Sequence, residues 1–347
     1  MTIPVPDLAA SRRALYLRLY EQNLAPLWEV MQQLVPEQPS TPCQPALWSY
    51  REVRPHLLAA GSVISAAEAI RRVLVLENPG MRGQSCITQS LYAGLQLILP
   101  GEVAPTHRHS QSALRLVIEG GGAHTNVDGE RIGMQPGDLI LTPSWTWHDH
   151  GHEGAEPVVW LDGLDLPIVQ AFGAQFGENH PQGIQPVSRS EGSSAARYGS
   201  HLKAVNAAVP CGQRSPIVSY PYSRSRESLA VLARETAPDP CHGWKMQYLN
   251  PHTGGSAIPT MAAYIQLLAK GCETRPCRST DGAVYCVVEG CGHVSLGGAT
   301  FAFEQHDVFV APSWVPVSVQ ASDEVVLFSF SDRPGQQAMG LWREERG

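Results

Sequence analysis

The chain has no apolar run long enough to span a membrane, and its first residues, MTIPVPDLAASRR, lack the basic-then-apolar order of a secretory signal. Basic residues are also scarce: there are 25 against 32 acidic ones, so the formal net charge is -7. This balance argues against a broad nucleic-acid-binding surface, although an acidic protein can still bind an anionic substrate where arginines gather locally. These absences predict a cytoplasmic protein that binds neither membranes nor nucleic acids.

Closely paired cysteines of the zinc-ribbon type are absent as well. The chain has 8 cysteines, and without an export signal we expect thiols rather than disulfides. Four of them, Cys272, Cys277, Cys286 and Cys291, crowd together, but their separations of 5, 9 and 5 do not give two close pairs. Cys286 lies in the apolar run AVYCVVEG, which is typical of a buried strand. Strand packing is therefore the preferred interpretation of this cluster, with zinc as the alternative.

Glycine and proline, by contrast, are plentiful, at 32 and 28 of 347 residues. Hydrophobic residues make up 43% and charged ones 16%, as in ordinary globular proteins, and the length suffices for about two domains. So many turn formers favour a fold of short strands joined by tight turns.

Helices are expected mainly before residue 85. Asp7 is a candidate N-cap for a helix that Pro26 ends or kinks, and a second helix is expected to begin near Ser65, in SAAEAIRR. After NPGMRGQ the pattern changes to strands, in ITQSLYAGLQLIL, ALRLVIEG, DLILTPSW and PVVWLDGL. Each run is short, rich in β formers and closed by Gly or Pro, which predicts a sandwich or barrel.

The strand-rich region occurs twice. Glu119-Gly120 recurs 170 residues later as Glu289-Gly290, and Pro143-Ser144-Trp145 recurs 169 residues later as Pro312-Ser313-Trp314. We therefore predict a mainly β protein built from two copies of one domain. The expected parts are an N-terminal helical arm and entry strand (1–84), the first copy (85–172), a linker (173–248) and the second copy (249–347). The linker is expected to contain short helices, one of them around 227–234.

Three histidines in the first copy form a pattern that suits a metal ion. His107-Arg108-His109 follows Gly101 after five residues, and His148 follows a second glycine- and proline-marked turn. Residues i and i+2 of a strand face the same side, so His107 and His109 can converge on one point, and a neighbouring strand can add His148. Three nitrogen ligands leave coordination positions open for substrate and oxygen. His150 faces the same side as His148 and is a candidate substrate contact, whereas His152 is expected in a loop.

This arrangement resembles the cupin signature. Where that signature often carries a glutamate ligand, this chain has Ala113 and Leu114. An iron(II) ion held by histidines alone keeps its double positive charge, which a dianionic chelating substrate neutralises and a neutral sugar does not. In the second copy the equivalent positions are Cys277, Ser279 and Val317, so we expect its metal ligands to be lost and its role to be packing and assembly.

More specifically, the chain resembles gentisate 1,2-dioxygenases, which are close to salicylate and 1-hydroxy-2-naphthoate dioxygenases. The resemblance is strongest in RRVLVLENPGMRGQS, LYAGLQLILPGEVAPTHRHSQSALR, PGDLILTPSWTWHDHGH and VLFSFSDRPGQQAMGLWREERG. It implies a bicupin of two double-stranded β-helices that assembles as a homotetramer or another oligomer. It also implies Fe²⁺ held by His107, His109 and His148, and cleavage of an aromatic acid by O₂ between the carboxyl- and hydroxyl-bearing carbons to give maleylpyruvate.

The resemblance further implies the residues of the pocket. The substrate-binding positions fall on Arg71 or Arg72, with the choice between the two left open, and on Tyr92, Gly94, Gln96, Arg115, His150 and Trp160. The catalytic ones fall on His150, Arg115, Gln96 and Asp162. Arg115 can grip a carboxylate as a fork, Gln96 can orient the ring hydroxyls, and His150 can accept or return a proton. Tyr92 favours gentisate, because the salicylate-cleaving relative carries tryptophan there.

Three alternatives stay open. A salicylate or 1-hydroxy-2-naphthoate dioxygenase would share the same metal site. A sugar-isomerase-type cupin with zinc would want a carboxylate near Ala113, which this chain lacks. A binding or storage bicupin without catalysis would not need to keep three histidines.

Overall fold

The computed structural model of the protein describes residues 8–199 and 214–347. Residues 8–40 and 41–347 fall into different compact units. The first unit contains two helices, α1 (Leu8–Glu21) and α2 (Leu27–Leu34). Asp7 lies outside the described residues. The prediction that Pro26 ends the first helix was wrong: α1 already ends at Glu21, and Pro26 is the N-cap of α2, where its missing N–H costs nothing.

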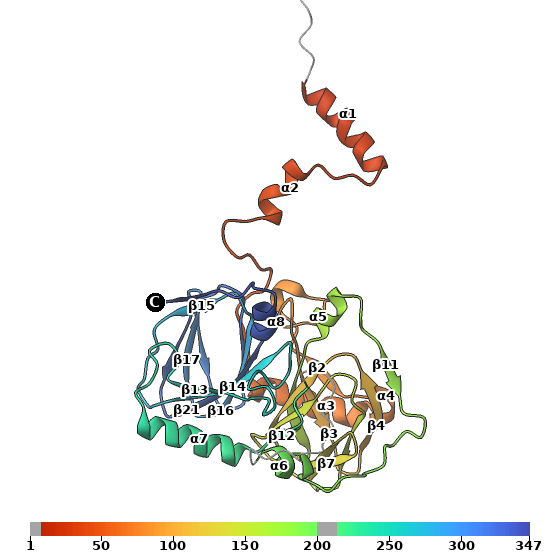
Figure 1. Ribbon diagram of the computed structural model, residues 1–347, viewed down its shortest axis with the longest axis vertical. Coiled ribbons are helices and arrows are strands. Elements are labelled where there is room, and N and C mark those ends of the chain that lie inside the picture. The colour runs from red at the N-terminus through yellow and green to blue at the C-terminus, as the bar shows by residue number, and fades with distance from the viewer. Residues whose placement is uncertain (1–7, 200–213) are drawn as a thin grey trace, which may run out of the picture. The chain divides into compact units, whose positions relative to one another are not determined.

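Residues 41–347 form two antiparallel β-sandwiches side by side (Figure 1). The first consists of a six-stranded sheet in the order β12-β8-β5-β10-β3-β2 and a five-stranded sheet in the order β11-β4-β9-β6-β7. Its strands are β2 (Val73–Val75), β3 (Tyr92–Ile98), β4 (Val103–His109), β5 (Ala113–Glu119), β6 (Ala123–Val127), β7 (Glu130–Gly133), β8 (Leu139–Thr142), β9 (His148–His152), β10 (Val158–Leu164), β11 (Gly177–Asn179) and β12 (Ser219–Tyr220).

The second sandwich repeats this plan with the orders β1-β19-β16-β21-β14-β13 and β18-β17-β20-β15-β22. Its strands are β1 (Ala46–Trp48), β13 (Trp244–Gln247), β14 (Ala262–Leu268), β15 (Cys277–Ser279), β16 (Ala283–Glu289), β17 (Gly292–Leu296), β18 (Ala299–Phe303), β19 (Val308–Ala311), β20 (Val317–Ala321), β21 (Val325–Ser331) and β22 (Glu344–Arg346). The bicupin prediction is confirmed.

The duplication extends to single backbone bonds. Trp145 and Trp314, which the repeat aligns, both have a positive φ, of 61° and 63°. Their N–H groups donate to equivalent carbonyls, Trp145 to His109 and Trp314 to Ser279. A bulky residue adopts this left-handed conformation only where the surrounding structure demands it, so the shared strain marks one turn built twice.

Segments outside the repeat complete both sandwiches. In the first copy β2, β11 and β12 pair with β3, β4 and β8, and in the second copy β13, β22 and β1 pair with the equivalent β14, β15 and β19. Each added strand covers a row of backbone N–H and C=O groups that an edge would otherwise leave unpaired. The segments expected as an arm and a linker therefore contribute strands to the two sandwiches.

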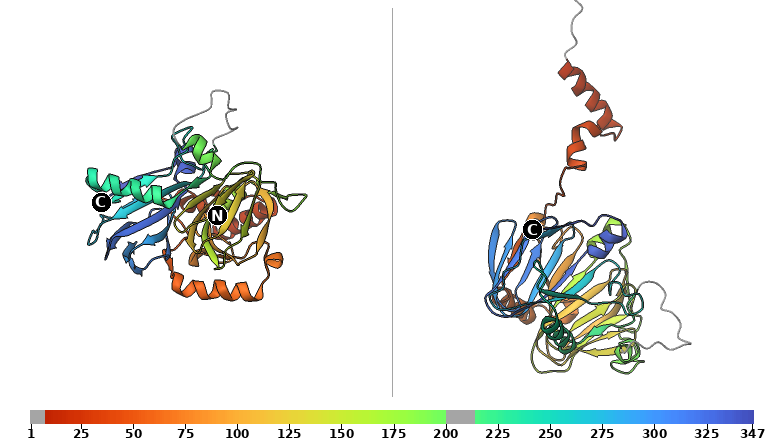
Figure 2. Two further views of the ribbon diagram at one scale, coloured as in Figure 1. Left: turned by 90° about the horizontal axis from the view of Figure 1, so that it is seen from below. Right: turned by 60° about the vertical axis from the view of Figure 1, so that its left-hand side comes forward.

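Helices connect and flank the sandwiches. The prediction missed α3 (Tyr50–Val63), because it contains Pro55 and Gly61, two residue types that usually disfavour a helix interior. A helix does begin at Ser65, whose side chain accepts from Glu68 N–H, but α4 (Ala66–Ala69) is short. The helix expected around 227–234 is α7 (Tyr222–Glu235), which runs along the second sandwich (Figures 1 and 2). The remaining helices are α5 (Leu166–Ala171), α6 (Ser193–Tyr198), α8 (Arg333–Ala338) and the 3₁₀ turn η1 (Pro79–Met81).

One apolar core joins the two sandwiches and decides which side chains face the site. Leu114 and Leu116 of β5 pack in a cluster that also contains Phe328 and Phe330 of β21. Alternation along β5 therefore turns Arg115 toward the interior of the first sandwich. Among the described residues, no helix is long and apolar enough to cross a membrane.

Candidate active site

The structure brings the three predicted histidines together inside the first sandwich. β4 supplies His107 and His109, and the paired strand β9 supplies His148, directly opposite His107. The Nε2 atoms of His107 and His148 are 2.9 Å apart, and one nitrogen from each of the three residues lies within 4.8 Å of the other two.

Hydrogen bonds and burial set the state of these imidazoles. His109 Nδ1 lies 2.9 Å from the Gln111 carbonyl and His148 Nδ1 lies 3.0 Å from the Thr146 carbonyl, so each can donate there and leave Nε2 free. Burial lowers the pKa of His107 to about 3 and that of His109 to about 4, and it also lowers the pKa of His148. All three are therefore neutral at pH 7, the form that binds a cation.

This set of donors fits a divalent metal ion. Two nitrogens bound to one ion at right angles, with bonds of about 2.1 Å, lie about 3 Å apart, close to the 2.9 Å between His107 Nε2 and His148 Nε2. At the positions where the cupin signature often has a glutamate ligand, Ala113 and Leu114 are fully buried and have apolar side chains, so they offer no fourth ligand. The first sandwich thus contains a cluster of three histidines that could hold a metal ion.

The wall beside the triad comes from β3, β5 and β10. In the register of these strands Asp162 lies opposite both Gly94 and Arg115, and Trp160 lies opposite Gln96. Tyr92 shares the face of Gly94 and Gln96 by alternation. The structure therefore gathers on one interior face the residues that the resemblance assigns to these three strands.

Arg115 is held rigidly by a buried ion pair. Its Nε lies 3.3 Å from Asp162 Oδ1, its Nη1 donates to Thr142 Oγ1, and Trp160 Nε1 donates to the same Asp162 oxygen at 3.1 Å. The side chains of Arg115 and Asp162 are only 5% and 7% exposed. Burial raises the pKa of Asp162 to about 6, against the opposing effect of Arg115, so the carboxylate is ionised at pH 7.

The structure separates the two adjacent arginines. Arg71 Nη2 lies 3.4 Å from His107 Nε2 and donates to the Pro105 carbonyl. Among the described residues, no carboxylate lies within ion-pair distance of Arg71. The sequence left open which of the two arginines faces the pocket. Arg72 is bound by Glu102, at 2.7 and 2.9 Å, and by the Ile64 carbonyl. The bend at Ile70 and Arg71, which precedes β2, separates the two side chains.

His150 is fully buried beside the triad. Its Nδ1 lies 2.8 Å from Thr125 Oγ1, while its Nε2 has no hydrogen-bond partner among the described residues. Its ring is 5.2 Å from that of Trp160 and 6.1 Å from that of His148, measured between centroids. His152 is not in a loop as expected: it belongs to β9, is buried, and its Nε2 lies 2.6 Å from the Glu156 carbonyl, because the alternation of β9 continues to the strand's end.

Sequence reasoning missed a polar network behind the triad. Asp149, between two of the site histidines, faces the other side of β9 and accepts hydrogen bonds from Thr106, Asn126 and Gln185. Gln185 also donates to the Asn126 carbonyl and accepts from Gly129 N–H. The network holds β4, β6 and β9 together. Gln185 belongs to the predicted linker, and nothing in the local sequence indicates that it contacts Asp149.

Gly94 leaves space that a side chain would close. A Cβ there would lie 2.5 Å from Val73 Cγ1 and 2.9 Å from the Tyr92 hydroxyl. We expect Gly94→Ala to displace Tyr92 and to lower kcat/KM about tenfold. This corresponds to a rise of about 1.4 kcal/mol in the activation free energy. Steady-state kinetics measure this change. Gly121→Ala is the matched control, because its Cβ would meet only Gln135 Oε1, at 3.7 Å, and equal losses in both variants would contradict the prediction.

Comparison with known proteins agrees with this geometry. Residues 94–164 match the family described as Cupin domain. A gentisate 1,2-dioxygenase from Aquipseudomonas alcaligenes is 51% identical over 98% of both chains, and one from Streptomyces sp is 37% identical over 96% of this chain and 95% of its own. The crystal structure of a salicylate 1,2-dioxygenase from Pseudaminobacter salicylatoxidans superposes with a TM-score of 0.91 at 33% identity, covering 100% of this chain and 99% of that one.

The duplicated cupin fold and its three-histidine cluster, taken together with these relatives, place the chain among the ring-cleaving cupin dioxygenases. Within that class the chain belongs to the gentisate 1,2-dioxygenase family, as its sequence motifs predicted.

Proposed function

We propose that the protein is an iron(II)-dependent dioxygenase that cleaves gentisate, 2,5-dihydroxybenzoate, between the carboxyl- and hydroxyl-bearing carbons to give maleylpyruvate. The observation that carries the proposal is a neutral three-histidine cluster with a half-buried guanidinium, that of Arg71, 3.4 Å from one ligand. The likeness to gentisate 1,2-dioxygenases and to a salicylate 1,2-dioxygenase solved as an adduct with gentisate supports the choice of substrate.

His107, His109 and His148 would hold the ferrous ion. When bound, the ion supplies open positions for substrate and O₂ and lowers the pKa of the substrate's hydroxyl. The histidine cluster includes no carboxylate that would neutralise the ion, so a chelating dianion is favoured over a neutral ligand.

Two arginines would position the substrate's carboxylate. Arg115 is already paired with Asp162, so its guanidinium is fixed in orientation and offers its remaining donors. Arg71 has no carboxylate partner among the described residues, and the substrate would supply one. Burial lowers the pKa of Arg71 to about 10, so it is still protonated at pH 7.

The remaining pocket residues would shape the site and move a proton. The unpartnered Nε2 of His150 is suited to accept a proton from a ring hydroxyl and return it. Gln96 would orient a ring hydroxyl, and Trp160 and Tyr92 would enclose the aromatic ring. Cytoplasmic location and a homotetrameric assembly remain predictions.

Oxygen uptake with three acids tests the proposed substrate. Iron-loaded protein is assayed with gentisate, salicylate and 1-hydroxy-2-naphthoate, and maleylpyruvate is followed by its absorbance. We expect the highest kcat/KM with gentisate, loss of turnover after chelation, and recovery with Fe²⁺ but not Zn²⁺. A preference for salicylate would favour the alternative dioxygenase, and no oxygen uptake with any acid would exclude the class.

Arg71 and Arg72 offer a matched pair of variants. Arg71→Gln should raise the KM for gentisate about tenfold or more, since a hydrogen bond to a charged group contributes about 1.5–3 kcal/mol. Arg72→Gln should instead lower the melting temperature, because it leaves Glu102 half-buried without its partner, and should leave KM nearly unchanged. Kinetics and thermal unfolding of both variants check this, and an unchanged KM in Arg71→Gln would remove that residue from the pocket.

A further inference from the structure

The second sandwich has a cluster of metal-ligating side chains that its motif positions do not explain. His242, Cys277 and Glu344 each offer one ligand atom, and these atoms lie within 4.8 Å of one another. His242 comes from the turn before β13, Cys277 from β15 and Glu344 from β22. We propose that this cluster is a second metal site, selective for zinc, which ties these three segments together.

The expectation of a second copy without metal ligands rested on the three positions that align with the histidines of the first copy. Two of these, Ser279 and Val317, offer no strong ligand, but Cys277 does. The tertiary structure then brings His242 and Glu344 to Cys277 from 35 and 67 residues away in the sequence. The site thus reuses one motif position and replaces the other two.

The distances suit an ion better than direct hydrogen bonds. His242 Nε2 lies 3.9 Å from Cys277 Sγ and 3.9 Å from Glu344 Oε1. The second separation is too long for a hydrogen bond. Zinc bound tetrahedrally, with bonds of about 2.0–2.3 Å, would hold such atoms about 3.3–3.6 Å apart. The atoms of these two pairs would need to approach by a few tenths of an ångström, and the third pair, Cys277 Sγ and the Glu344 carboxylate, lies within 4.8 Å.

The backbone around the cluster is fixed before any ion binds. Asp239 accepts hydrogen bonds from the N–H groups of Cys241 and His242 and forms an ion pair with Arg346 of β22. In the register of β15 and β22, Ser279 lies opposite Glu344 and Cys277 opposite Arg346. The turn that carries His242 and the strand that carries Glu344 are thus both anchored, so binding costs little ordering entropy.

One imidazole, one thiolate and one carboxylate form a donor set typical of zinc, and the soft thiolate disfavours Mg²⁺ and Ca²⁺. Cys277 would bind as a thiolate, its proton passing to solvent. The thiolate and the carboxylate together balance the charge of a divalent ion, so the occupied site is itself neutral. Binding thereby neutralises Glu344, whose carboxylate lies 3.9 Å from the Arg333 guanidinium. Arg333 keeps its own partner, Asp281, at 3.4 Å.

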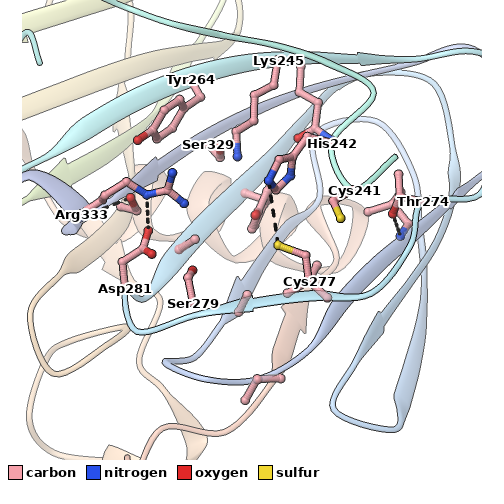
Figure 3. Close-up of a pocket in the computed structure, with 18 of the residues that line it drawn as sticks. Cys241, His242, Lys245, Tyr264, Thr274, Cys277, Ser279, Asp281, Ser329 and Arg333 are labelled. Carbon is pink, nitrogen blue, oxygen red and sulfur yellow. Dashed lines mark hydrogen bonds and ion pairs between the residues drawn. The ribbon is translucent and has the colours of Figure 1, made fainter. Parts of the chain in front are cut away.

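His242 and Cys277 border a cavity of about 40 Å³, into which Lys245, Ser279 and Arg333 also point (Figure 3). Such a space accommodates a few water molecules but not an aromatic acid. The open fourth position of the ion would therefore hold water or a small anion beside the Lys245 amine. The site stabilises structure and does not bind the ring-cleavage substrate.

Cobalt(II) is the probe for this site, because a thiolate bound to Co²⁺ gives a charge-transfer band in the near ultraviolet. The full-length His148→Ala variant is used, so that the first sandwich does not compete for metal. We expect one Co²⁺ per chain, a thiolate band, and its disappearance on adding one equivalent of Zn²⁺. Cys277→Ser in this background should abolish the band, whereas Cys291→Ser, an exposed cysteine of the same sandwich, should retain it.

A second variant guards against misfolding. Glu344→Gln keeps the size and the thiol, and it should lose retained zinc after dialysis and the rise in melting temperature that zinc gives the parent. A band that persists in Cys277→Ser, or a parent that retains no zinc, would overturn the proposal. None of these readouts depends on oxygenase activity, so the two proposals can fail separately.

Discussion

His148→Ala is expected to abolish turnover. The residue is fully buried, and its Nε2 lies 2.9 Å from that of His107, so its loss leaves two nitrogen ligands for the ion. Because metal catalysis contributes several kcal/mol, kcat for gentisate should fall by about a thousandfold or more. The iron content of purified protein should fall from about one per chain toward zero.

The control is His293→Ala, an exposed histidine on β17 of the second sandwich. It should keep its iron content and kcat. Melting curves of iron-free protein show whether His148→Ala is still folded. Iron bound at the parental level together with retained turnover would place the reaction elsewhere in the molecule.

Arg115→Met is expected to reduce stability and activity together, for separable reasons. The substitution leaves the Asp162 carboxylate buried without its cation, which costs about 3–5 kcal/mol. It also removes a carboxylate-binding group, which should lower kcat/KM for gentisate about a hundredfold. Urea unfolding of the iron-free protein measures the first effect without any contribution from the metal, and steady-state kinetics measure the second.

A double variant separates the two effects. In Arg115→Met/Asp162→Asn the buried charge is gone, so most of the lost free energy of unfolding should return while kcat/KM stays low. If the double variant is as unstable as Arg115→Met, the unpaired carboxylate is not the cause of the instability. If its activity also recovers, Arg115 acts only through the fold.

The two arginines beside the histidine cluster, the buried Arg115 and the half-buried Arg71, thus have different partners. Arg115 is neutralised within the protein by Asp162, while Arg71 has no carboxylate partner among the described residues. An anionic substrate would complete the second pair. This asymmetry gives the pocket a local preference for acids, despite the chain's overall charge of -7.

Within single strands, sequence alone predicted a great deal. The period of two along a strand is a local property, so the spacing of His107 and His109 was enough to assign them to one face. The same rule placed His148 and His150 together. The repeat, with its shared turn at Trp145 and Trp314, was also visible in the sequence, because each copy must build the same turn with its own residues.

Tertiary structure decided what depends on which segments become neighbours. The sequence left open which of Arg71 and Arg72 faces the site, and only the contacts of the folded chain separate them: Arg71 lies beside His107, and Arg72 is bound to Glu102. Gln185 binds Asp149, and His242 and Glu344 join Cys277, through contacts between residues 35 to 67 positions apart. The alternation of side chains along a strand depends on the local sequence alone. The pairing of distant strands depends on how the whole chain packs.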